Sequence, residues 1–382
     1  MKRSIYILVL VGILVSIVFS ACAPKPAPLP SPTAPAPVAT PATAPLVKPV
    51  PETDSWAQVL SAAHKEGVVN VYTWVLAGDA GNVVSKAFKD KYGIELRLVT
   101  GIGPTLIERI KTELAAKKYV ADTMDFATAQ LAIAKDEGLT VPVGELPILA
   151  ERDVWLVFPP LDLEKHIVGM GTGIIAPYVN TTMVKPGEEP RSYKDLLQPK
   201  WKGKLVAQDT NVGPLLNRLY AVMVPAKLLD EDFFRGLGRQ GIRMVPTARD
   251  ADAVVVRGEL PIIVPGSSLS MGPLVKEGAP VKPLDMEEGT INSVGPGIAM
   301  VKNAPHPNAA RVFINWVLSA EGQRVLHEVR ASTPIRKDVP DFVPAGARLT
   351  PRKFLVADMK VDVEAARLAR EKVIARLIGL EK

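Results

Sequence analysis

The sequence predicts an α/β protein with two lobes, each a mixed, mostly parallel sheet flanked by helices. Strand-like and helix-like segments alternate from residue 68 onward, which is the pattern of parallel strands joined by crossover helices. The part of the chain that can fold begins near Asp54 and holds about 330 residues. A single hydrophobic core rarely supports a chain of that length, so we expect two lobes.

The first lobe is expected to begin with three strand–helix repeats. Its strands, rich in β-branched and aromatic residues, are predicted at 68–74, 94–99 and 123–126. The segments after them carry apolar residues at helical spacing. Gly93 suits the end of the first helix, Gly103-Pro104 the start of the second, and the third runs to about Glu137. These repeats predict a largely parallel sheet covered by helices.

The rest of the chain continues the alternation. Further strands are predicted at 168–179, 203–207, 243–245, 260–264 and 293–301. Further helices are predicted to end near Met223 and to span 248–257, 308–318, 320–329 and 361–380. The strand at 168–179 is expected to leave the first lobe, and the strand at 293–301 to return to it.

The N-terminus has the layout of a secretory signal peptide over residues 1–21. A basic start, Met1-Lys2-Arg3, precedes an apolar run from Ile5 to Phe19 and then Ser20-Ala21. A membrane span needs about 20 apolar residues, so a single N-terminal membrane helix is the less favoured alternative.

Cys22 is the only cysteine of the chain, so an internal disulfide is excluded. Together with Phe19-Ser20-Ala21 it resembles a bacterial lipoprotein box, although that box usually begins with Leu. The resemblance implies cleavage before Cys22 and its acylation, which would anchor the protein to a membrane at the outer face of the cell or in the periplasm. An acyl chain contributes about 0.8 kcal/mol of membrane affinity per buried methylene.

Residues 22–53 are expected to form a tether, because they are dominated by Pro, Ala, Thr and Val and have no apolar periodicity. An extended tether of this kind could reach about 80 to 90 Å.

The formal charge of +6 overstates the basicity of the folded part. Without Lys2, Arg3, Lys25 and Lys48 the 46 basic residues fall to 42, and without Glu52 the 40 acidic residues fall to 39, which leaves +3. Nucleic-acid binding calls for clustered basic residues, so no nucleic-acid partner is expected.

Several runs resemble the extracellular solute-binding components of ABC importers, in the subgroup of ferric-iron, thiamine, phosphonate and polyamine binders. The clearest is YKDLLQPKWKGK at 193–204. Asn303 to Ala310 with Phe313, then Leu318 to Gln323, resemble a helix pair of that family, and 256–259 and 276–281 also fit.

The resemblance implies a two-lobed, type II periplasmic-binding-protein-like fold. The first lobe would combine 54–172 with 292–382, and the second would span 173–291. The ligand would lie in the cleft between the lobes, which closes on it. The implied partners are a small-molecule solute and an ABC permease in the membrane, and we expect a monomer.

Ligands of open α/β sheets bind beyond the carboxyl ends of the strands, near helix N-termini that favour anionic groups. This rule selects four loops. The alternative interpretation of each selected residue is a structural one, as a helix cap or a core residue. The candidate ligand-binding residues are Thr73, Trp74, Gly78, Asp79, Thr128, Asp209, Thr210, Asn211, Gly213, Ser267 and Ser268.

The iron-binding relatives use an adjacent tyrosine pair that would fall near Gly266 to Met271. That stretch reads GSSLSM, and no tyrosine follows Tyr220. We therefore expect a small, anionic or polar organic solute, with neither a metal nor a cofactor. A ferric-iron receptor with unusual ligands and a non-transport sensor lipoprotein remain as alternatives.

An enzyme is disfavoured. The run at 266–270 lacks the closing glycine of a G-x-S-x-G elbow, and the four histidines show no metal-binding spacing. His64, His166, His306 and His327 are expected to be structural or on the surface.

Overall fold

The structure is a computed structural model that describes residues 55–156, 160, 164–349, 353–357 and 359–381. The predicted signal peptide, Cys22 and the tether lie outside these residues. The described residues belong to one compact unit. Among them, no helix is both long enough and apolar enough to cross a membrane.

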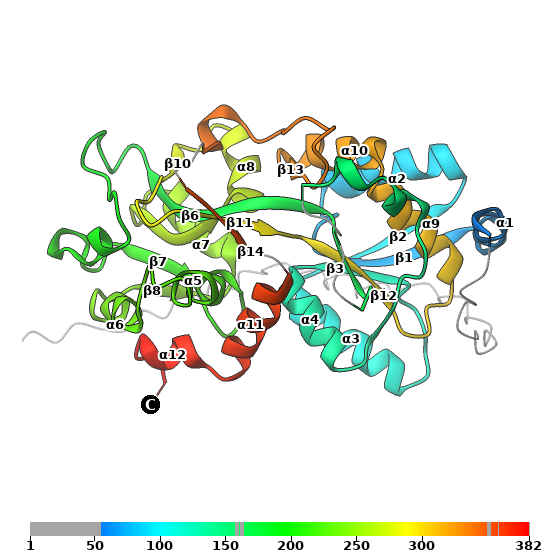
Figure 1. Ribbon diagram of the computed structural model, residues 1–382, viewed down its shortest axis with the longest axis horizontal. Coiled ribbons are helices and arrows are strands. Elements are labelled where there is room, and N and C mark those ends of the chain that lie inside the picture. The colour runs from blue at the N-terminus through cyan, green and yellow to red at the C-terminus, as the bar shows by residue number, and fades with distance from the viewer. Residues whose placement is uncertain (1–54, 157–159, 161–163, 350–352, 358, 382) are drawn as a thin grey trace, which may run out of the picture. The chain divides into compact units, whose positions relative to one another are not determined.

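The helices alternate with the strands along most of the chain (Figure 1). The α-helices are α1 (Trp56–Glu66), α2 (Asp79–Tyr92), α3 (Gly103–Ala115), α4 (Thr128–Asp136), α5 (Leu215–Met223), α6 (Glu231–Arg239), α7 (Ala248–Val256), α8 (Ser268–Lys276), α9 (Pro307–Val317), α10 (Ala320–Arg330), α11 (Met359–Arg370) and α12 (Val373–Leu377). Short 3₁₀ helices are η1 (Pro147–Ala150), η2 (Arg152–Val154), η3 (Lys194–Leu197), η4 (Pro199–Trp201) and η5 (Ala345–Ala347).

The strands form two sheets, which confirms the predicted two-lobed α/β class. The first sheet holds β1 (Val68–Thr73), β2 (Glu95–Thr100), β3 (Thr123–Phe126), β4 (Thr140–Val141), β5 (Ile167–Gly169) and β12 (Gly297–Val301). The second sheet holds β6 (Gly171–Asn180), β7 (Leu205–Gln208), β8 (Arg243–Val245), β9 (Ile262–Ser267), β10 (Val281–Pro283), β11 (Thr290–Val294), β13 (Thr333–Pro334) and β14 (Phe354–Ala357).

The first sheet has the order β2-β1-β3-β12-β4, with β5 also paired to β12. The strands β1, β2 and β3 are parallel, as the three strand–helix repeats predict. The strand β12 is antiparallel to β3, β4 and β5 because it enters the sheet from the other direction.

The second sheet has the order β14-β11-β6-β9-β7-β8. Its strands β7, β8 and β9 are parallel, whereas β6 is antiparallel to both β9 and β11. The chain therefore crosses between the sheets from β5 to β6 and again from β11 to β12.

The predicted strand at 293–301 is in fact two strands in different sheets. Its first part belongs to β11 and its second part to β12, and the break falls at Gly295-Pro296. Proline lacks the N–H group that a continuous ladder needs, which accounts for the break. We call residues 294–297 the crossover.

The predicted helix at 361–380 is likewise divided into α11 and α12. Lys372 lies between them with a positive φ of 53°, a left-handed conformation that a continuous helix excludes.

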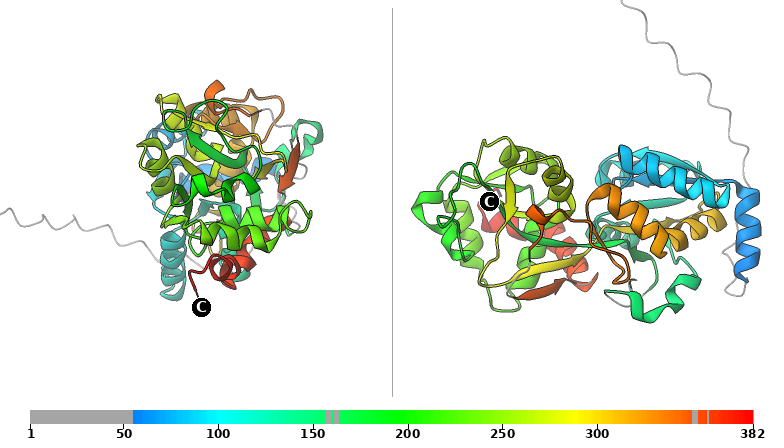
Figure 2. Two further views of the ribbon diagram at one scale, coloured as in Figure 1. Left: turned by 90° about the vertical axis from the view of Figure 1, so that its left-hand side faces the viewer. Right: turned by 90° about the horizontal axis from the view of Figure 1, so that it is seen from above.

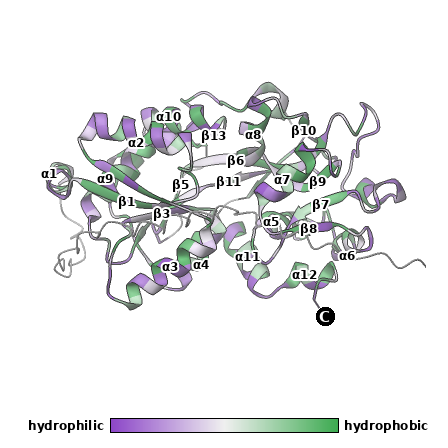
Figure 3. Ribbon diagram, turned by 180° about the vertical axis from the view of Figure 1, so that it is seen from behind, coloured by the Kyte–Doolittle hydropathy of each residue, from purple (hydrophilic) through white to green (hydrophobic). Residues whose placement is uncertain are grey.

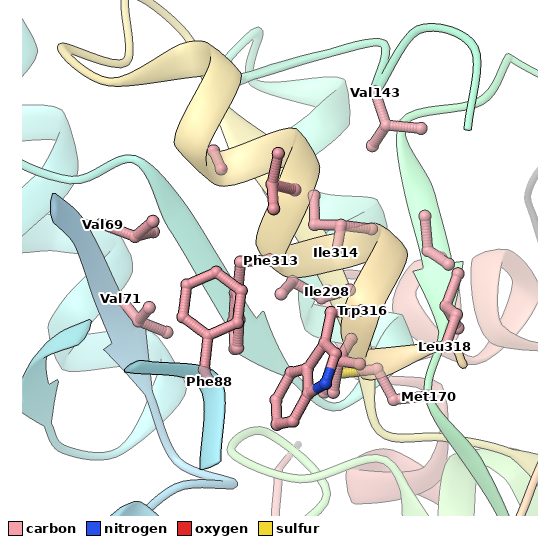
Figure 4. Close-up of a cluster of buried hydrophobic side chains, with 14 of the residues drawn as sticks. Val69, Val71, Phe88, Val143, Met170, Ile298, Phe313, Ile314, Trp316 and Leu318 are labelled. Atoms are coloured by element: carbon pink, nitrogen blue, oxygen red, sulfur yellow. The ribbon is translucent and has the colours of Figure 1, made fainter. Parts of the chain in front are cut away.

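The first hydrophobic core lies against the first sheet (Figure 4). Phe88 of α2 packs on Phe313 and Trp316 of α9, with ring centroids 5.3 and 5.4 Å apart. These three side chains are at most 1% exposed, and aromatic pairs at this separation add to the stability that burial itself provides. Figure 3 shows the corresponding pattern, with predominantly hydrophobic strands such as β1 and helices that carry both kinds of residue.

The second hydrophobic core lies against the second sheet and includes the C-terminal segment. Ile374 and Ile378 belong to this core. A Cβ atom at Gly238 of α6 would lie 2.4 Å from the carbonyl oxygen of Ile378, so the two segments are in close contact. With β14 paired to β11, we propose that the chain from about residue 354 belongs to the second lobe. Figure 2 shows this segment, in red, beside elements of the second sheet.

Candidate functional site

The carboxyl ends of β1 and β3 meet at a buried carboxyl group. Thr73 pairs with Asp125 in the parallel register of these strands. The Thr73 hydroxyl donates a 2.7 Å hydrogen bond to Oδ1 of Asp125, and the backbone N–H groups of Trp74 and Val75 donate to the same oxygen at 3.1 and 2.9 Å. Thr73 is fully buried, and its hydroxyl also accepts a hydrogen bond from the N–H of Leu76 at 2.7 Å. The predicted ligand residue Thr73 therefore organises the loop after β1.

Asp125 is 1% exposed, and burial raises its pKa to about 7 because the charged form loses its hydration. The hydrogen bonds from Thr73, Val75 and Trp74 and the charge of Arg330 act in the opposite direction. Its second oxygen, Oδ2, has no hydrogen-bond partner among the described residues. The sequence places Asp125 at the end of the third predicted strand, so the strand-end rule could have selected it.

Arg330, the last residue of α10, lies beside this carboxyl group. Its guanidinium donates to the carbonyl oxygen of Val75 and lies 5.5 Å from the centroid of the Trp74 ring. Such cation–π stacking is worth about 0.5–2 kcal/mol, depending on solvent exposure. Trp74 is half-buried. The ring of this predicted ligand residue therefore stacks with Arg330, which the sequence did not predict for the site.

A second arginine approaches from the other sheet. Arg249 lies in the first turn of α7, which packs on β7 and β9. Burial lowers the pKa of Arg330, the charge of Asp125 raises it, and the charge of Arg249 lowers it further. Among the described residues, neither arginine has a carboxylate within ion-pair distance. Two guanidinium groups, from α10 and α7, thus influence each other with no ion-pair partner in the described chain.

Asp252 lies one turn beyond Arg249 and is 2% exposed. Burial raises its pKa to about 7, while the nearby Ser270 side chain and the charge of Arg249 lower it. Because a carboxyl group with this pKa is partly protonated near neutral pH, it only partly offsets the charge of Arg249.

The predicted serines lie at the start of α8. Ser267 caps this helix by accepting a hydrogen bond from the N–H of Leu269 at 3.3 Å. The Ser268 hydroxyl is buried and accepts a 3.0 Å hydrogen bond from the N–H of Ile174 in β6. Ser268 therefore joins α8 to β6, and both serines have structural partners.

The loop of 209–213 is held by its own hydrogen bonds. Asp209 accepts from the N–H of Asn211 at 2.8 Å, and the Asn217 side chain donates to the carbonyl oxygen of Thr210 at 2.8 Å. Asn211 is exposed, whereas Thr210 and Gly213 are buried. The Thr210 hydroxyl has no partner in the part of the chain that the structure describes.

The remaining predicted residues differ in exposure. Gly78 and Asp79 are exposed at the start of α2, where Gly78 has a positive φ of 66° that favours glycine. Thr128 is fully buried at the start of α4 and is bonded to Arg218 and Asp362. The structure thus joins Thr73 to Trp74, Ser267 to Ser268, and Asp209 to Gly213 within their loops.

Three of the histidines have structural partners, and Nδ1 of His166 lies 2.6 Å from the hydroxyl oxygen of Thr140. His327 is buried between the Ser332 hydroxyl and the carbonyl oxygen of Met170, and burial lowers its pKa to about 4. His306 lies 2.9 Å from Oδ2 of Asp122. In the described residues, no three His, Cys, Asp or Glu side chains gather as a metal site would require.

A surface hollow of about 360 Å³ lies elsewhere on the first lobe, and none of the predicted residues lines it. The guanidinium of Arg311 in its wall lies 6.0 Å from the centroid of the Trp56 ring and donates to the carbonyl oxygen of Glu145 at 2.8 Å. These contacts give Arg311 a structural role.

The two sheets are joined by chain segments that cross between them, which gives the molecule a two-lobed architecture. Residues 84–350 match the sequence profile of the bacterial extracellular solute-binding proteins, so the chain belongs to that family. It is a solute-binding protein of the ABC-importer type, and the family is extracytoplasmic.

Two curated relatives are similar over most of their length. An uncharacterized protein of Haemophilus influenzae is 28% identical over 70% of this chain and 77% of its own length. Iron uptake protein A1 of Synechocystis is 26% identical over 68% of this chain and 76% of its own length.

Solved structures share the fold at lower identity. A Trichodesmium protein, IdiA or FutA, in complex with iron and citrate has a TM-score of 0.64 and 23% identity over 82% of this chain and 100% of its own. AfuA of Actinobacillus pleuropneumoniae, with bound fructose-6-phosphate, has a TM-score of 0.67 and 20% identity over 81% of this chain and 97% of its own. The fold alone follows from these similarities.

Proposed function

We propose that the chain is a lipid-anchored receptor that captures a small anionic or polar organic solute by closure of its two lobes and delivers it to an ABC permease. The observation that carries the proposal is the pair Arg330 and Arg249. Arg330 lies in α10, which packs mainly on α2 and α9 of the first lobe, and Arg249 lies in α7, which packs on β7 and β9 of the second. The charge of Arg249 acts on Arg330, and the described residues offer neither arginine an ion-pair partner. An anion between them would relieve their repulsion and bring the lobes together, which is the differential interaction that closure needs.

The bound molecules of the structural neighbours support an anionic solute. Citrate and fructose-6-phosphate are both anions, and they are bound by proteins of this fold. Asp125 and Trp74 lie beside Arg330 and would contact the remaining, polar part of the solute.

The experiment is a thermal-shift screen of the full-length protein against citrate, dicarboxylates, sugar phosphates and inorganic phosphate. Binding to the folded state raises the melting temperature, because stability increases by RT ln(1 + [L]/Kd). Arg330→Gln and Arg249→Gln should each raise the dissociation constant of an anion found in this screen about 10-fold or more, since each removes a charge-assisted contact.

The matched control is Arg239→Gln, which removes an exposed arginine from the end of α6 on the second lobe. It should leave the dissociation constant unchanged. A solute whose affinity is the same in the wild-type protein and in both test variants would contradict the arginine site.

A second candidate solute is ferric iron carried as its citrate complex. Iron uptake protein A1 and the iron-and-citrate complex of the Trichodesmium protein favour it, whereas the stretch from Gly266 to Met271 contains no tyrosine. Titration with ferric citrate and with citrate alone separates the two. Tighter binding of ferric citrate, or a visible tyrosinate charge-transfer band, would favour iron.

Lipid anchoring at Cys22 is proposed from the sequence. Metabolic labelling with a radioactive fatty acid should label the wild-type protein and should not label Cys22→Ser. Label on the serine variant would show that another residue is acylated. A sensor role is tested by deleting a neighbouring permease gene. A sensor takes no part in transport, so uptake of the solute should persist after the deletion.

A further inference from the structure

A buried cluster of three side chains joins three helices at the crossover. Thr128 is the first residue of α4, Arg218 lies in α5, and Asp362 lies in α11. The side chains of Arg218 and Asp362 are 6% and 2% exposed, and Thr128 is fully buried.

The three side chains bond to one another. Nε of Arg218 donates to Oδ1 of Asp362, and Nη2 of Arg218 donates to the Thr128 hydroxyl at 2.6 Å. The Thr128 hydroxyl donates to Oδ2 of Asp362. The two carboxylate oxygens of Asp362 thus accept hydrogen bonds from different lobes, Oδ1 from Arg218 and Oδ2 from Thr128.

The cluster connects the two sheets. Helix α4 follows β3 of the first sheet, and α5 follows β7 of the second. A Cβ atom at Gly295, in the crossover, would lie 3.7 Å from Oγ1 of Thr128 and 3.9 Å from Nη2 of Arg218. Helix α11 packs on both α4 and α5 (Figure 1).

The surroundings of Asp362 have the properties of an anion site. The N-terminus of α4 has no side-chain cap at Ala127, and the partial positive charge of a helix N-terminus favours an anion. The buried guanidinium of Arg218 adds a full positive charge from the opposite lobe.

We infer that Asp362 is an internal anionic ligand, supplied by α11, that bridges the two lobes at the crossover and closes this position to anions from solution. It is a positioning residue, since it ties Thr128 to Arg218 and is not expected to touch the solute. The inference rests on the contacts of these three residues and holds whichever solute the protein carries.

The test is chemical rescue of Asp362→Ala in the full-length protein. This substitution removes the carboxylate and leaves Arg218 and Thr128 around the vacated position. Formate should then bind and raise the melting temperature, by about 2 °C for each tenfold increase in its concentration above its dissociation constant. The wild-type protein should show no such response at equal ionic strength, with sodium chloride as the reference.

Two further variants make the result specific. Asp362→Ala combined with Arg218→Met should lose the formate response, because the cation that holds the anion is gone. A folded Asp362→Ala protein without a formate response, or a double variant that still responds, would overturn the inference.

A second measurement covers the case in which Asp362→Ala does not fold. Asp362→Asn keeps the shape of the side chain and removes its charge, so amide hydrogen exchange should increase by tenfold or more at the crossover, measured at the amides of Val294, Gly295 and Gly297. The control Asp136→Asn breaks the exposed 2.9 Å contact between Arg370 of α11 and Asp136 of α4, and it should leave exchange at the crossover unchanged. Equal exchange in Asp362→Asn and wild-type protein would refute the bridging role.

Discussion

The buried carboxyl group of Asp125 makes the stability of the protein depend on pH in a direction that can be worked out from the structure. Its pKa in the folded protein is about 7, against 3.8 for an unperturbed aspartate. Between these values the folded protein holds a proton at Asp125 and the unfolded chain does not. Because the folded state binds more protons, the free energy of unfolding decreases as pH rises through this window.

The size of the effect follows from the same two pKa values. The difference is roughly 3 pH units, and each unit is worth 1.36 kcal/mol, so about 4 kcal/mol of stability is lost between about pH 4 and pH 7. Asp125→Asn removes the titrating group and keeps an oxygen that accepts from the N–H groups of Trp74 and Val75. Relative to wild type, the variant should therefore gain about 4 kcal/mol across this range of pH.

The assay is urea unfolding of the full-length protein, followed by circular dichroism at intervals between about pH 4 and pH 8, where the product of the midpoint shift and the m-value gives the difference. The control Asp153→Asn makes the same charge change at an exposed residue of η2. Wild-type and Asp125→Asn curves that stay parallel over the whole range would refute the reasoning, because the carboxyl group would then titrate equally in both states.

Two further substitutions test the packing that supports the site. Ser268→Ala leaves the N–H of Ile174 without its acceptor and should lower the free energy of unfolding by about 1–3 kcal/mol, measured by urea unfolding. The cap variant Ser267→Ala is the control and should cost about 1 kcal/mol. A loss in Ser268→Ala no larger than that of the control would assign Ser268 a capping role only. Phe88→Ala should cost about 3–5 kcal/mol because it empties a fully buried position. Its control is Val83→Ala on the exposed side of the same helix, and similar losses for the two variants would contradict the description of the first core.

Much of the first lobe could be predicted because its signals are local. The alternation of β-branched and helical segments predicts β1, β2 and β3 within one residue at each end, and Gly93 ends α2 in the left-handed conformation that favours glycine. The break between β11 and β12 was missed, although Gly295-Pro296 stands at its centre. A continuous apolar run has the same composition whether it stays in one sheet or passes between two.

The candidate site was harder to predict because its contacts join distant parts of the chain. The strand-end rule selected Thr73 and Trp74, yet the groups that give this region its charge are Asp125 and Arg330. Arg330 lies 255 residues from its acceptor Val75, and Asp362 lies 234 residues from Thr128. Such partners have no spacing that a single sequence can display. Thr128 stays a predicted ligand contact, and the structure bonds its hydroxyl to Arg218, Asp362 and the backbone of Val294.

The two arginine positions between the lobes differ in a way that bears on where a solute would bind. Arg218 is buried against the carboxylate of Asp362, so its charge is neutralised within the protein. Arg249 and Arg330 influence each other and have no ion-pair partner among the described residues. Like charges repel, and a conformation that brings these two guanidinium groups together is stabilised by an anion between them. Under both proposals, Arg218 and Asp362 keep the lobes connected without a solute, whereas Arg249 and Arg330 make closure of the lobes depend on a bound solute. Formate rescue at Asp362 and solute binding at Arg330 should then be independent, and a loss of solute affinity in Asp362→Asn equal to that in Arg330→Gln would contradict this separation.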